Sequence, residues 1–185
     1  MLDAYVGDRP IIAAVWQSLK ADLAVVRERR QPFSAYIYPC VFIVVVYRLA
    51  NALGRRRLTV PARALQIIGL ILAGANVDWR SDLGPGVFFE HPHGVGIGDG
   101  VKVGRNAIIG QGVVLGAAHG PSGEGGFPTL GDNVQIWAKA SVIGPVHVGD
   151  GAIIGAHAVV VSDVPAGTVA RGVPARAYAD GQLVG

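Results

Sequence analysis

Two regions of the chain differ in the spacing of their apolar residues. From Pro10 to about position 74, apolar residues recur every three or four positions, as in amphipathic helices. Pro32 and Ser34 mark the end of the first helical stretch, Gly54 follows a second and Pro61 opens a third. The sequence therefore predicts three short helices, the first with an apolar stripe of Ile12, Val15, Trp16, Leu19, Leu23 and Val26.

After Asn76 the apolar period becomes six residues. Glycine follows many of the periodic positions and relieves tight corners. This period predicts a parallel β-helix, in which each unit gives one short strand and one corner, and three units complete a coil. The predicted inward positions are Val77, Leu83, Phe89, Ile97, Val103, Ile109, Leu115, Leu130, Ile136, Val142, Val148, Ile154 and Val160.

Two interruptions of this period carry three of the five histidines. Two extra residues lie around Glu90, His91 and His93. Nine more fall within a glycine-rich excursion from Ala117 to Phe127 that contains His119. Loops that leave a rigid scaffold often carry function. The interruptions therefore predict a functional site.

Composition excludes several classes of protein. A single cysteine, Cys40, excludes an intrachain disulfide and favours a cytoplasmic location. The arginine clusters at positions 27–30 and 55–57 lack a nucleic-acid-binding motif or aromatic platform, so no nucleic-acid partner is predicted. The N-terminal segment lacks the order of an export signal, and the apolar runs at 35–47 and 65–75 are too short to span a bilayer. Peripheral membrane contact stays open but is not favoured.

The histidines also lack the spacing of common zinc motifs, so no metal is predicted. His147 and His157 lie in regular repeats and are expected to face solvent.

Several segments resemble the serine acetyltransferases among hexapeptide-repeat acyltransferases. The shared segments are Asp22-Leu23 to Arg29, Tyr47-Arg48-Leu49-Ala50, Val77-Asp78, Glu90-His91, Gly94-Val95-Gly96-Ile97-Gly98 and Gly172-Val173-Pro174-Ala175-Arg176. The resemblance implies a mainly β fold: a left-handed parallel β-helix at 76–178, after an N-terminal α-helical region at 1–75 and before a tail at 179–185. It also implies a homotrimer with active sites between neighbouring subunits.

The resemblance further implies an acetyl-CoA-dependent acetyltransferase that works by direct attack. His91 would be the general base that takes the proton of the acceptor hydroxyl, and Asp78 would orient its ring. The positions that would bind acetyl-CoA are Gly116, Ala138, Lys139, Ala156, Arg171 and Arg176.

The predicted acceptor pocket departs from the family pattern. Arg30 replaces an aspartate that binds the ammonium of serine, and Gly126-Phe127 replaces an Arg-His pair. Glu90, His93 and His119 also differ from the usual residues and complete the predicted acceptor site. Free serine would lose the charge-assisted hydrogen bonds of the replaced residues, which contribute about 1.5–3 kcal/mol each. A sugar or specialised metabolite is therefore expected as the acceptor in place of free serine.

Three alternatives remain open at this point. An amine or amino sugar could be the acceptor, because a base and a thioester groove also serve N-acetylation. A second alternative is a catalytically inactive trimeric scaffold. A third is a metal-dependent hydratase of the carbonic anhydrase type, which would need three zinc-binding histidines.

Overall fold

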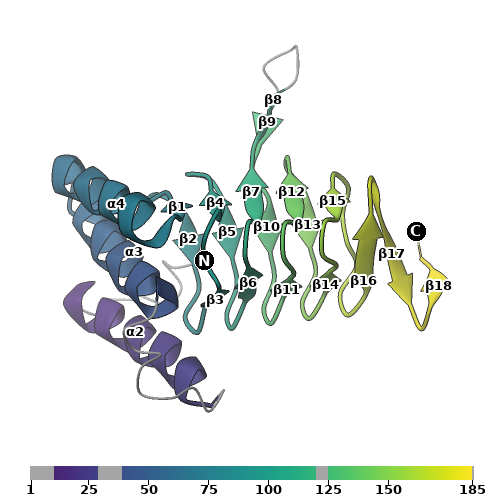
Figure 1. The fold of residues 1–185 in the computed structure, drawn as a ribbon, viewed down its shortest axis with the longest axis horizontal. Coiled ribbons are helices and arrows are strands. Elements are labelled where there is room, and N and C mark those ends of the chain that lie inside the picture. Colours follow the sequence, from purple (N-terminus) through teal and green to yellow (C-terminus); the bar gives the residue numbers. More distant parts are fainter. Residues whose placement is uncertain (1–10, 29–38, 120–124, 185) are drawn as a thin grey trace.

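A computed structural model describes residues 11–28, 39–119 and 125–184 of the 185-residue chain. The helices come first, as predicted: α2 (Ile11–Glu28), α3 (Pro39–Arg55) and α4 (Thr59–Ala73). They lie at one end of a long solenoid of short strands (Figure 1). Among the described residues, no helix is both long and apolar enough to cross a membrane.

The solenoid is a parallel β-helix with three faces, and it confirms the predicted fold class. Face A contains β1 (Asn76–Val77), β4 (Gly96–Ile97), β7 (Val114–Gly116), β12 (Ser141–Ile143) and β15 (Val159–Val160). Face B contains β2 (Asp82–Leu83), β5 (Lys102–Val103), β10 (Thr129–Leu130) and β13 (His147–Val148). Face C contains β3 (Phe88–Glu90), β6 (Ile108–Gly110), β11 (Gln135–Ile136), β14 (Ile153–Ile154), β16 (Val169–Gly172), β17 (Ala175–Ala179) and β18 (Gln182–Leu183).

Successive coils stack in register, which explains the six-residue period. Val77 pairs with Ile97, which pairs with Leu115, which pairs with Val142, which pairs with Val160. Every predicted inward position is at most 3% exposed, so the predicted core is confirmed. At the C-terminal end, β17 and β18 turn back as antiparallel strands, and β18 lies within the segment predicted as a tail.

The excursion after Leu115 is a separate antiparallel hairpin of β8 (Ala118–His119) and β9 (Gly125–Gly126). It projects from the side of the solenoid, as Figure 1 shows. The predicted excursion is therefore confirmed.

A buried polar anchor ties the helices to the first coil. Arg48 on α3 forms a two-point contact with Asp22 on α2, with Nε–Oδ2 at 2.9 Å and Nη2–Oδ1 at 3.1 Å. Asp22 also accepts hydrogen bonds from the backbone N–H groups of Gly86 and Val87, while Arg48 donates to two carbonyl groups of the same coil. The several partners of each charge offset part of the cost of burying the pair.

Two details of the helices differ from the sequence prediction. Gly54 lies inside α3 instead of following it, and the ring of Trp79 packs where a side chain at Gly54 would lie. Trp16 was predicted on the buried stripe of the first helix but is 56% exposed, since α2 packs mainly through residues nearer its C-terminal end such as Asp22 and Val26.

Candidate active site

His91 occupies a corner between β3 and β4. Its backbone is in the left-handed region, with φ 53°, and the residue is exposed. The inserted segment is fixed by backbone hydrogen bonds from Gly94 N–H to Gly74 O (2.8 Å) and from Gly112 N–H to His93 O (3.0 Å). A rigid corner therefore presents His91 at the surface. His93 instead lies against Gly74, the residue that ends α4.

Four of the six residues predicted to bind acetyl-CoA form a column along this same corner. Lys139 N–H donates to Gln111 O of the preceding coil. In the next coil, His157 N–H donates back to Ala138 O. Ala156 lies next to His157, and Arg171 lies beside Gly155 in the following coil. The structure thus brings His91, Ala138, Lys139, Ala156 and Arg171 to one edge of face A, named here the His91 edge.

The two arginines predicted to bind acetyl-CoA lie on the C-terminal hairpin. Arg171 on β16 pairs in register with Arg176 on β17, and both residues are exposed. The Arg171 guanidinium stacks on the ring of Tyr178, 4.2 Å from its centroid. Paired exposed guanidinium groups can bind phosphate.

A second group of predicted residues lies at the opposite edge of face A, named here the Asp78 edge. Asp78 follows β1, Gly116 ends β7, and the β8–β9 hairpin begins next to it. Phe127 ends this excursion and packs over the corner of Gly98 and Gly100, where a Cβ on Gly98 would lie 2.6 Å from Phe127 Cε1. The half-buried Phe127 ring therefore packs on two glycines of its own chain.

Asp78 is the centre of an arginine cluster. Its carboxylate lies 3.0 Å from Arg80 Nε and 3.4 Å from Arg63 Nη1, and it accepts a hydrogen bond from the backbone N–H of Arg80. Burial alone would raise the pKa of the Asp78 carboxyl, but the hydrogen bonds and charge of Arg80, with the charge of Arg63, hold the pKa below its ordinary value. Asp78 is therefore a stable anion.

Within one chain, Asp78 and His91 lie at different corners. Strands β1 and β4 pair side by side, with His91 before β4 and Asp78 after β1. In the described residues no hydrogen bond joins them. Asn76, which begins β1, lies instead at the His91 edge, where its Oδ1 accepts a hydrogen bond from Gln66 Nε2 (2.7 Å). Asn76 was not among the predicted site residues, although its position at the start of the first coil places it at this edge.

The remaining predicted residues are placed only in part. Glu90 ends β3, half-buried and in register with Gly110. His119 lies on β8, and Arg30 falls outside the described residues. Over residues 11–28, 39–119 and 125–184, no group of three His, Cys, Asp or Glu side chains could hold a metal ion.

The stacked coils match known hexapeptide-repeat proteins. The sequence profile of the bacterial transferase hexapeptide (six repeats) matches residues 127–162. Together, the profile and the three-faced solenoid define a hexapeptide-repeat transferase.

Relatives give a closer assignment. The chain is 39% identical over 140 residues to the serine acetyltransferase of Helicobacter pylori strain J99, covering 76% of this chain and 81% of the relative. It is 37% identical to that of Mycobacterium tuberculosis, covering 91% and 72%. A crystal structure of Neisseria gonorrhoeae serine acetyltransferase in complex with serine matches with a TM-score of 0.82 and 29% identity, covering 96% of this chain and 72% of that one.

The chain belongs to the serine acetyltransferase family. It is an acetyl-CoA-dependent O-acetyltransferase, and acetyl-CoA is its co-substrate.

Proposed function

We propose that this protein transfers the acetyl group of acetyl-CoA to the hydroxyl of serine. The observation that carries the proposal is the similarity to serine acetyltransferases along most of the chain, including a neighbour solved with serine.

This proposal corrects the sequence-based expectation of a sugar or specialised metabolite. That expectation depended on Phe127 as an apolar wall for the acceptor and on Arg30 as a new charge. Phe127 packs on Gly98 and Gly100 of its own chain, so its ring has a structural partner and need not contact an acceptor. Arg30 lies outside the described residues, and the relatives point to serine.

The proposed active site lies between two copies of the chain in a homotrimer. The predicted residues occupy two edges of face A, with His91 at one edge and Gly116 and Asp78 at the other. A site that uses both edges is completed when the Asp78 edge of one copy faces the His91 edge of the next, as cyclic symmetry allows. In this arrangement Asp78 would lie near His91 of another copy. Asn76 is the residue that lies at the His91 edge within the same chain.

The chemistry requires a base but no covalent enzyme intermediate. His91 takes the proton from the serine Oγ as this oxygen attacks the thioester carbonyl of acetyl-CoA. The C–S bond then breaks, and the protonated imidazole returns the proton to the leaving thiolate. The products are O-acetylserine and coenzyme A. The column of Ala138, Lys139 and Ala156 would hold the pantetheine arm, while Arg171 and Arg176 would contact the phosphates.

Release of the coenzyme A thiol tests the proposal. Wild type, His91→Ala and His157→Ala are assayed with serine, homoserine, sugars and amino sugars. His157 is the matched control, because it is also exposed and also has a left-handed backbone at this corner, with φ 59°. Serine should be the best acceptor, and only His91→Ala should lose about a hundredfold or more of the activity. A better sugar or amine acceptor, or equal losses in both variants, would refute the proposal.

A further inference from the structure

Helix α4 buries its small residues and exposes its large ones. Its buried face consists of Ala62, Gln66, Gly69 and Ala73, and a Cβ on Gly69 would lie 2.9 Å from Ile43 Cδ1. The opposite side, named here the outer face, consists of Val60, Ala64, Ile67, Ile68 and Ile71. Val60 is 80% exposed and Ile71 is 71% exposed. Contiguous apolar surface of this kind usually marks an interaction site.

Exposed positive charge lies beside one end of the outer face. From Arg29 to Val77 the sequence has seven arginines and no acidic residue. Arg55, Arg56 and Arg57 are all exposed in the segment that leads into α4. An apolar helix face beside a cluster of arginines is typical of helices that lie in the surface of an anionic membrane.

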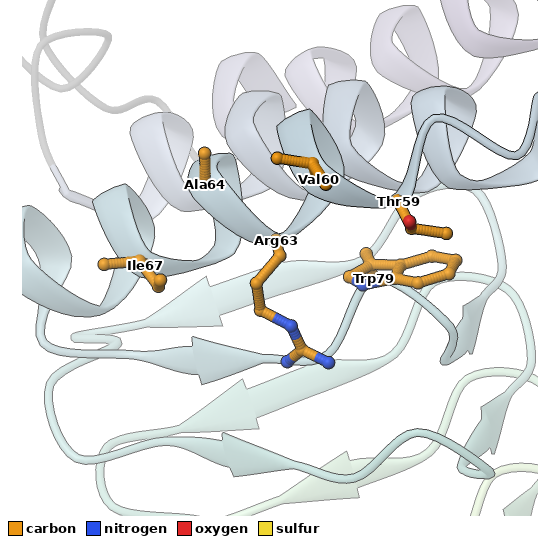
Figure 2. Close-up of a pocket in the computed structure, with 6 residues that line it drawn as sticks. All are labelled: Thr59, Val60, Arg63, Ala64, Ile67 and Trp79. Carbon is orange, nitrogen blue, oxygen red and sulfur yellow. The ribbon is translucent and has the colours of Figure 1, made fainter.

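A cavity of about 470 Å³ continues the outer face toward the solenoid. Figure 2 shows its lining: Val60, Ala64 and Ile67 lie along α4, and the Arg63 side chain extends from the helix toward the strands beside Trp79. Arg63 is half exposed although it also contacts Gln66 and Asp78. The buried indole N–H of Trp79 has no acceptor in the described part of the chain. These groups suit an anionic head with an apolar tail.

We propose that α4 docks in the plane of an anionic membrane. The outer face enters the boundary of the acyl chains, Arg56 and Arg57 contact headgroup phosphates, and the cavity beside Arg63 receives one headgroup. A second copy docked by this same face would supply no acidic partner for these arginines, because positions 29–77 contain no acidic residue. A membrane instead supplies both the apolar layer and the negative charge. This inference is independent of which acceptor the enzyme uses.

Flotation with lipid vesicles tests the proposal on the full-length protein. Wild type should float with phosphatidylcholine vesicles that contain about one-third phosphatidylglycerol, and much less with phosphatidylcholine alone. Ile67→Ser/Ile71→Ser should lower partitioning by at least about tenfold. The control Val161→Ser/Leu183→Ser changes exposed apolar residues on the solenoid and should not change partitioning.

Two further readouts complete the test. In Arg56→Gln/Arg57→Gln the preference for anionic vesicles should fall roughly thirtyfold, because each of the two arginines contributes a similar share of the attraction to the anionic surface. Acetyl transfer in solution and the molar mass by light scattering should match wild type in all these variants. No flotation on anionic vesicles, or equal flotation of Ile67→Ser/Ile71→Ser, would overturn the proposal. A changed molar mass of Ile67→Ser/Ile71→Ser would also overturn it and identify the outer face as an interface between copies.

Discussion

The β-helix and the helical region bury their residues by different rules. In the β-helix each coil is covered by the next, so the large aliphatic residue of every repeat points inward, as Ile136 does. In α4 the large residues point outward, and a stripe of small residues packs on α3 instead. Apolar spacing therefore predicts burial well in the β-helix, where each coil packs on the next coil of the same repeat. For a helix, the partner decides which face is buried.

The largest expected effect comes from the anchor that joins the two regions. Asp22→Ala leaves Arg48 buried without its counter-ion and should cost about 3–5 kcal/mol of stability. Asp132→Ala is the matched control, because Arg105 makes a similar contact with Asp132 (2.7 Å) on the exposed surface of the β-helix. It should cost at most about 1 kcal/mol. Urea unfolding measures both values, and equal losses would contradict the importance of burial here.

The next prediction compares two isoleucines directly. Ile136→Ala creates a cavity in a fully buried position of the β-helix and should cost about 2–5 kcal/mol. Ile71→Ala removes a side chain that is 71% exposed, and alanine is the better helix former, so stability should stay the same or rise slightly. The midpoints of urea unfolding give both values. A large loss in Ile71→Ala would mean that α4 has a buried outer face in solution.

A smaller effect is expected at the junction between the regions. The pKa of Asp78 is lower in the folded protein than its ordinary value, since Arg80 outweighs the effect of burial. Asp78 therefore contributes stability that is complete above a pH of about 4 and is lost as the pH falls through the lower folded pKa. The stability difference between wild type and Asp78→Asn should shrink in acid, as measured by urea unfolding at several pH values. A difference that grows in acid would contradict this assignment.

The sequence predicted the core more accurately than the site. The six-residue period identified every inward position tested, because one residue in each repeat must fill the same space. It also located both interruptions. The period does not show which corner each interruption occupies, so it could not show that face A separates Asp78 from His91 within one chain. The predicted partnership of the two residues stays a prediction. Likewise, the sequence could not show that Trp79 would cover Gly54, or that Phe127 would cover Gly98, because both contacts join distant segments.

The central claim is that each active site takes one edge of face A from each of two copies. His91→Ala removes the base from one edge. Gly116→Leu blocks the predicted coenzyme groove at the other edge, and the fold has room for a Cβ there, which would lie 3.6 Å from Ile143 Cδ1. Each variant alone should be inactive.

Refolding equal amounts of the two variants together, followed by assay of acetyl transfer to serine, is the most direct test. If sites are shared, random assembly should restore about one quarter of the wild-type activity, because that fraction of interfaces receives both intact edges. If the mixture is as inactive as its parents, each site lies within a single chain and the account is wrong.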